Sequence, residues 1–145
     1  MQSMNDNIGQ KLNDMLQGEM SAVETYNQAL KKVDDPSIRA ELTEAQQCHL
    51  GRVQTLQEKV IEAGITPAKT SGAWGAFAKT VEGGAALLGD RAAVSILEEG
   101  EDKGLKDYKN LLNDTSMEVR PVVAMLLERQ MWTHQKVSDL KHRMQ

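Results

Sequence analysis

Aromatic residues are scarce in this sequence. They make up 3% of its 145 residues, with a single Phe, so a core has to be filled by Leu, Val, Ala and the eight Met. Such side chains suit the packing of helices better than a β-sandwich. The hydrophobic share of 40% and the charged share of 26% indicate a globular chain, and the length predicts one domain over residues 1–145.

The sequence also lacks an excess of positive charge, a pair of cysteines and long apolar runs. The net charge is −4 and no cluster of Lys and Arg stands out, which argues against a general nucleic-acid binder. Cys48 is the only cysteine, so an intramolecular disulfide is excluded and a reducing compartment is compatible. The first 14 residues hold no apolar stretch of signal-peptide type, and no run approaches a membrane span. We therefore expect a cytoplasmic protein that binds neither nucleic acid nor membrane.

Four long segments have the apolar periodicity of amphipathic helices. The second begins clearly, because Asp35-Pro36 combines an N-cap residue with proline at the first helical position. The start of the fourth is open, because Thr115 and Glu118 have capping-box spacing whereas Pro121 favours a later start. The expected helices cover residues 5–33, 36–63, 90–113 and a last segment that ends near 143.

The stretch between the second and third helices differs in composition. Residues 65–89 hold Pro67, five glycines, Trp74 and Phe77, and predict a crossover with a short helical piece around residues 74–81. A connection of this length can span a bundle, so that the helices before and after it run parallel. Two hairpins joined by one long crossover are the connectivity of an all-α, ferritin-like four-helix bundle.

The two halves of the chain repeat a short motif. Gly18-Glu19 is followed by six residues and Tyr26, and Gly100-Glu101 is followed by six residues and Tyr108. Seven residues are close to two helical turns, so Glu and Tyr share one face, and it is the apolar face. The same stripe test places at least one polar residue inward on each of the four expected helices: Glu19 and Tyr26, His49 with Gln46 beside it, Glu101 and Tyr108, and Gln130 and His134.

Two carboxylates in a helical core need partners, because a lone buried charge is costly. They could coordinate a metal, accept hydrogen bonds from Tyr, Gln and His, or take up a proton and have a raised pKa. Carboxylate with imidazole suits Fe, Mn or Zn, and Glu and Glu-x-x-His positions facing a bundle core build di-metal proteins. The candidate ligands are Glu19, His49, Glu101 and His134, with Glu98 as a further carboxylate.

Two departures from the di-metal pattern are visible in the sequence. The expected Glu-x-x-His positions read Gln46-x-x-His49 and Met131-x-x-His134, so neither imidazole has its carboxylate. Repeat spacing pairs His49 with Gln130, which leaves His134 one turn further along. Whether Gln130 or His134 completes the core site is left open by the spacing.

Gly18-Glu19-x-x-Ala22-x-x-x-Tyr26 resembles the first-helix motif of rubrerythrin-type ferritin-like proteins. Nearly the whole chain is similar to a bacterial family of ferritin-like bundles described as a domain of unknown function. That similarity is carried by residues 12–19, by Ser71-Gly72-Ala73-Trp74-Gly75 and by residues 97–101. The resemblance implies the fold, implies Glu19, His49, Glu101 and His134 as possible metal ligands, and makes Tyr26 and Tyr108 their hydrogen-bonding partners.

Two functional hypotheses follow. The first is a bundle with a reduced site for Fe, Mn or Zn in a stress-related role, which as an enzyme would be an iron-dependent oxidase or peroxidase. The alternative is a metal-free structural or interaction bundle with a hydrogen-bonded polar core. We favour a non-catalytic or weakly metal-binding bundle over an enzyme. In either case we expect a homodimer through an outer helix face. Membrane-surface association through an amphipathic helix is a weaker idea, because the chain is acidic.

Overall fold

The protein consists of two helical hairpins, and the two helices of each hairpin are antiparallel. The structure, a computed structural model, describes residues 2–72 and 89–144, with side chains from residue 7 onward. The helices are α1 (Gln2–Lys32), α2 (Pro36–Glu62), α4 (Asp90–Asp114) and α5 (Arg120–Arg143). They confirm the all-α four-helix bundle. The crossover helix expected around residues 74–81 lies outside the described residues.

Local chemistry explains where these helices begin. Asp35 caps α2 as predicted, because its carboxylate accepts hydrogen bonds from the backbone N–H groups of Ser37 and Ile38. Of the two starts considered for the last helix, the one predicted from the capping-box spacing of Thr115 and Glu118 is wrong. The Thr115 hydroxyl instead donates to the carbonyl oxygen of Leu112, and α5 begins at Arg120 with proline in its first turn.

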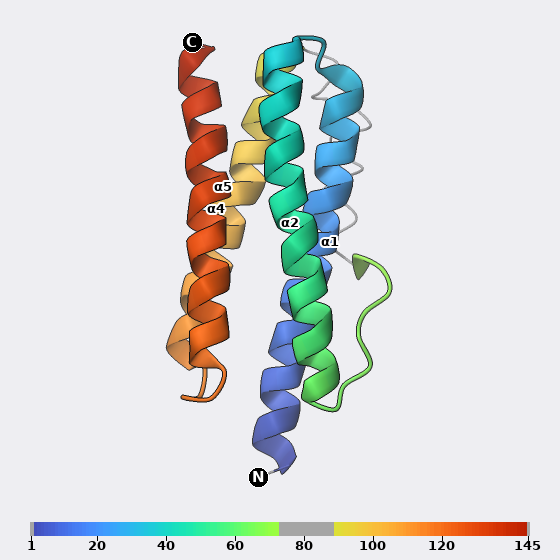
Figure 1. The fold of residues 1–145 in the computed structure, drawn as a ribbon, viewed down its shortest axis with the longest axis vertical. Coiled ribbons are helices and arrows are strands. Elements are labelled where there is room, and N and C mark those ends of the chain that lie inside the picture. The colour runs from blue at the N-terminus through green and yellow to red at the C-terminus, as the bar shows by residue number, and fades with distance from the viewer. Residues whose placement is uncertain (1, 73–88, 145) are drawn as a thin grey trace.

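Each helix packs against two neighbours. α1 packs most extensively on α2, and α4 on α5, while α1 against α4 and α2 against α5 form the two looser seams. Figure 1 shows α2 and α4 both running from the upper end of the bundle to the lower end. The helices on either side of the crossover are therefore parallel, as the length of the connection predicted. Within residues 2–72 and 89–144, no helix is long and apolar enough to cross a membrane.

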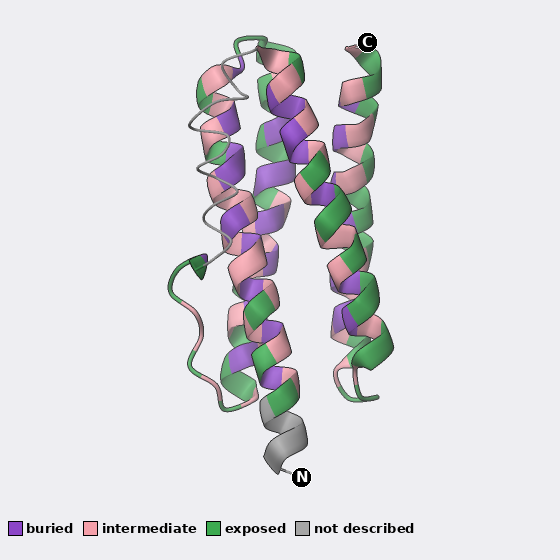
Figure 2. Ribbon diagram, turned by 180° about the vertical axis from the view of Figure 1, so that it is seen from behind, coloured by how far each residue is buried: buried purple, intermediate pink, exposed green. Residues whose placement is uncertain are grey.

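The core consists of two apolar layers with a polar layer between them. Figure 2 shows the buried positions as stripes along the inner faces of the helices. One apolar layer lies toward the α1–α2 turn and includes Tyr26, Leu42, Leu97 and Val137. The other lies toward the α4–α5 turn and includes Leu12, Leu56, Tyr108 and Leu126. The polar layer between them consists of Glu19 from α1, His49 and Arg52 from α2, Glu101 from α4, and Gln130 and Thr133 from α5.

Candidate functional site

The repeated Gly-Glu and Tyr motifs meet across the bundle. Tyr26 donates a hydrogen bond to Glu101 Oε2 at 2.6 Å, and Tyr108 donates one to Glu19 Oε2 at 2.5 Å. Each tyrosine therefore binds the carboxylate of the opposite half of the chain. Both tyrosines and both glutamates are at most 4% exposed.

His49 lies between the two carboxylates. Its Nδ1 is 2.5 Å from Glu19 Oε1, and its Nε2 is 2.7 Å from Glu101 Oε2. An ionised carboxylate only accepts hydrogen bonds, so both ring nitrogens carry a proton and the ring is an imidazolium. Burial lowers the pKa of His49, but the charges of Glu101 and Glu19 outweigh it and hold that pKa above its usual value.

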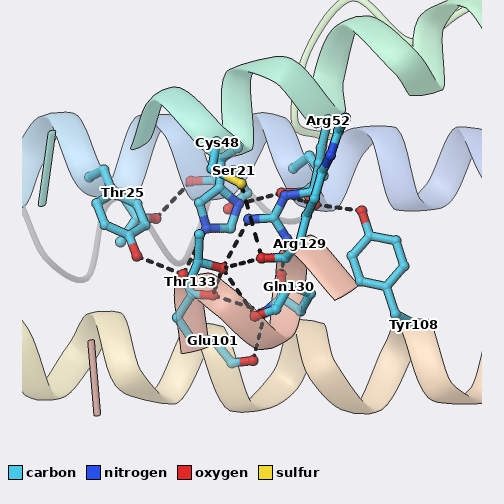
Figure 3. Close-up of polar contacts among 12 residues, drawn as sticks. Ser21, Thr25, Cys48, Arg52, Glu101, Tyr108, Arg129, Gln130 and Thr133 are labelled. Atoms are coloured by element: carbon cyan, nitrogen blue, oxygen red, sulfur yellow. Dashed lines mark hydrogen bonds and ion pairs between the residues drawn. The ribbon is translucent and has the colours of Figure 1, made fainter. Parts of the chain in front are cut away.

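Arg52 supplies a second positive charge and is 0% exposed. Its Nε lies 3.3 Å from Glu19 Oε2, and its terminal nitrogens donate to the Gln130 amide oxygen and, at 3.0 Å, to Thr133 Oγ1. The geometry to Glu19 is that of an ion pair and not of a hydrogen bond, and Nε is the one buried side-chain N or O atom without a hydrogen-bond partner in the described residues. Figure 3 shows the side chain of Arg52 extending from α2 toward Gln130 and Thr133 on α5.

Glu101 is held from α5 as well. Gln130 donates from Nε2 to Glu101 Oε1 at 2.9 Å and to the Glu101 backbone oxygen at 2.8 Å. Thr133 donates to the same Oε1 at 2.7 Å. Together with Tyr26 and His49, these donors engage both oxygens of the carboxylate.

The two carboxylates are ionised in spite of their burial. Burial alone would raise the pKa of Glu101, but the charges of His49 and Arg52 and the hydrogen bonds from His49 and Tyr26 lower it to about 2. For Glu19, burial again acts to raise the pKa, and Arg52 and His49 lower it below the usual value. The layer thus contains two negative and two positive charges and carries no net charge.

Three of the four candidate ligands come together, and the fourth does not. His49 is within hydrogen-bond distance of both Glu19 and Glu101. The expectation that His134 points into the core is wrong: its side chain is 26% exposed and its Nε2 lies 2.6 Å from the surface carboxylate of Asp102. Gln130 completes the cluster in its place.

Other candidates are likewise engaged elsewhere. Glu98 forms an ion pair with Lys141 at 2.9 Å, so it is not a further core carboxylate. Gln46 is buried, but its amide donates to Asn27 Oδ1 at 2.6 Å and to the Val23 carbonyl oxygen at 3.1 Å. It therefore joins α2 to α1 and lies outside the charge cluster.

Arg52 and Thr133 are the two site residues that the stripe analysis missed. After His49 the helical period allows either position 52 or position 53 to face inward, and the apolar Val53 fitted the stripe better. The repeat did contain a signal, because Arg52 and Thr133 are 81 positions apart, which is also the separation of His49 and Gln130. The need for a cation beside two buried carboxylates was a second signal.

The polar layer differs from the pattern of di-metal bundles. Those proteins place a Glu on each of two helices and a Glu-x-x-His pair on each of the other two, all facing inward. Here Glu19 and Glu101 correspond to the first pair, while the polar layer takes His49 and Arg52 from α2 and Gln130 and Thr133 from α5. In the described residues no group of three or more His, Cys, Asp or Glu side chains is arranged to hold a metal ion.

Comparison with known proteins agrees with this architecture. A solved structure described as "ferritin like, diiron-carboxylate proteins from Bacillus anthracis str. Ames" superposes with a TM-score of 0.78. The alignment covers 97% of this chain and 99% of that chain at 18% sequence identity, which establishes a shared fold. No curated protein matches the chain. The family described as "Domain of unknown function (DUF2383)" matches residues 7–114. The chain therefore belongs to the DUF2383 family, and it has the fold of a ferritin-like four-helix bundle.

Proposed function

We propose that this chain is a metal-free binding bundle, in which an internal ion-pair cluster takes the place of a di-metal centre. The observation that carries the proposal is the placement of two cations, His49 and Arg52, against the two core carboxylates. In a di-metal bundle the metal ions neutralise the glutamates. In this chain, side chains supply that charge.

The donor set does not fit a dinuclear metal centre. Two carboxylates are missing, because α2 and α5 contribute no acidic side chain to the polar layer. Of the two imidazoles only His49 is present, because His134 lies beside Asp102 and the other residues of the polar layer from α2 and α5 are Arg52, Gln130 and Thr133. Arginine remains charged and has no lone pair for a metal, so Arg52 repels a cation and cannot bind one.

The side chains that could still act as metal ligands already have hydrogen-bond or ion-pair partners. Every oxygen of Glu19 and Glu101 is within hydrogen-bond or ion-pair distance of a partner. Both nitrogens of His49 face carboxylates, so the ring has no lone pair for a metal until it loses a proton and breaks one of these bonds. The arrangement therefore supports neither ferroxidase nor peroxidase chemistry.

Metal content of the purified protein tests this proposal. Protein is purified without chelator, loaded in turn with Fe(II), Mn(II) and Zn(II), and desalted. The amount of metal bound per chain is then measured by elemental mass spectrometry. We expect less than stoichiometric metal in each case. A variant that rebuilds the pattern, His49→Glu with Arg52→His, Gln130→Glu and Thr133→His, is expected to bind metal under the same conditions.

Stoichiometric metal in the wild type that disappears in Glu101→Gln contradicts the proposal. The rebuilt variant serves as the positive control, because it shows that the loading procedure can fill a site in this bundle. Its helical content by circular dichroism is compared with that of the wild type before loading.

A further inference from the structure

A pocket of about 310 Å³ lies between α1 and α4, along one of the two looser seams. Small residues from both helices line it, Gly18 and Ala22 on α1 and Gly100 and Gly104 on α4, and a Cβ at Gly18 would meet no atom within 4 Å. Its volume is at the lower end of the range of roughly 300–1,000 Å³ that small-molecule pockets occupy. The cavity is thus large enough for a single small ring system.

One wall of the pocket is the polar layer itself. Tyr26, Tyr108, Glu19, Glu101 and His49 all line it. The tyrosine hydrogens are donated to the carboxylates, so each phenol oxygen offers the pocket only an acceptor. The polar wall can therefore recognise a ligand that donates an O–H or N–H hydrogen bond.

The remaining walls favour an uncharged, apolar ligand. Met15, Leu97 and Leu111 supply apolar surface. Five charged side chains also line the pocket: four of them form two ion pairs, Lys11 with Asp114 and Lys103 with Asp107, and the fifth is Asp14. The polar layer beside them carries no net charge, because His49 and Arg52 balance the two glutamates. A charged ligand would lose its hydration without finding an opposite charge at this wall.

We propose that the pocket binds a small, uncharged aromatic molecule that carries an O–H or N–H donor, of the phenol or indole class. This inference rests on the proposed metal-free function and names the ligand class of the same site. The aromatic ring would lie against the apolar walls, and its donor would reach the oxygen of Tyr26 or Tyr108. Shape and apolar contact would provide most of the affinity, and the tyrosines would select for the donor.

Isothermal titration of the purified full-length protein with phenol and with indole tests this proposal, with toluene and benzoate as comparison ligands. We expect saturable binding of phenol or indole that is at least tenfold tighter than that of toluene, which lacks the donor, and of benzoate, which is charged. Equal affinity for toluene, or no saturation by either donor ligand, overturns the proposal.

Two glycine variants locate the site. A Cβ at Gly18 or at Gly51 would meet no atom within 4 Å, so both helices can accept a side chain there. Gly18→Leu extends into the pocket and is expected to abolish binding, whereas Gly51→Leu on α2, which does not line this pocket, is expected to leave it unchanged. Loss of binding in both variants, or in neither, contradicts the assignment.

Ligand-induced NMR shifts in the wild type locate the ligand without any variant. We expect the largest changes at the amides of Gly18, Gly100 and Gly104. Changes centred on Trp132, at the opposite seam, overturn the proposal. A titration that fails while the protein is shown to be metal-free refutes only the ligand class, and stoichiometric metal refutes the function on which it rests.

Discussion

Tyr26 donates a hydrogen bond to Glu101 across the bundle, at 2.6 Å, from the first half of the chain to the second. Tyr108 returns the same contact to Glu19. The repeat of Glu and Tyr seven residues apart is thereby explained. On each helix the tyrosine lies two turns beyond its own glutamate, and the antiparallel neighbour places the other glutamate at that height. The motif thus joins the two halves by a matched pair of buried hydrogen bonds.

The two tyrosines provide a direct spectroscopic test of this arrangement, because they are the only ones in the chain. Burial, and then the charge of the bonded glutamate, raises the pKa of Tyr26 and of Tyr108 well above 10.0. A raised pKa in the folded state stabilises the fold below the unfolded value near 10, and this stability is lost as pH rises further. We expect tyrosinate absorbance to appear only together with loss of helical circular dichroism. A tyrosinate signal in protein that remains folded at pH 10 would contradict the hydrogen bonds described.

Arg52→Met tests the charge balance of the polar layer. The substitution leaves the two carboxylates with His49 as their only cation, and removing one partner of a buried ion pair destabilises a protein by about 3–5 kcal/mol. We expect a loss of unfolding free energy of this order in urea denaturation. Lys59→Ala, which breaks a surface pair with Glu62, is the control, and we expect it to change stability by less than about 1 kcal/mol. Equal effects of the two variants would show that Arg52 does not neutralise the cluster.

Gly104→Ala tests the approach of Gln130 to α4. An added Cβ would lie 2.7 Å from Gln130 Nε2, so the amide that bonds Glu101 has to move. We expect destabilisation, although Ala is favoured over Gly in a helix by about 1 kcal/mol. Gly18→Ala is the matched control, because its Cβ meets nothing within 4 Å and only the helical preference remains. It is expected to raise the midpoint of thermal unfolding, and the opposite signs of the two variants are the diagnostic result.

Acid should weaken the bundle through Glu101. Its pKa is lowered from 4.5 to about 2, so its contribution is present above pH 4.5 and is lost as pH falls toward 2. By the linkage relation this shift corresponds to about 3 kcal/mol. We expect the unfolding free energy to fall over this interval by an amount of that order from Glu101. In Glu101→Gln the loss over the same interval should be smaller by this amount, and an unchanged slope would contradict the assignment.

Much of the fold followed from periodicity and turn chemistry. The apolar stripes, the Asp35-Pro36 cap and the length of the crossover predicted two hairpins with parallel inner helices, and the structure confirms them. The inward direction of Glu19 and Glu101 also followed from their places on these stripes. Such signals are local, because each depends on residues within a few turns of one helix.

The inward residues at the edges of each stripe were harder to predict. Positions three and four residues after an inward residue are both allowed to face the core, and the sequence alone chose Val53 and His134 where the bundle uses Arg52 and Thr133. On each of these helices, the predicted and the observed inward faces differ by a rotation about the helix axis of a fraction of a turn. That rotation is set by packing against the neighbouring helices and cannot be found from the period of one segment.

By itself, the sequence determined that two carboxylates and two tyrosines would lie on the inner faces of a four-helix bundle, because seven-residue spacing on an apolar stripe has no other helical outcome. Only the tertiary structure decided what neutralises those carboxylates. Distances between side chains on different helices depend on the relative height and rotation of the helices, and these place the imidazole of His49 and the guanidinium of Arg52 against the carboxylates, where a di-metal bundle would hold its metal ions.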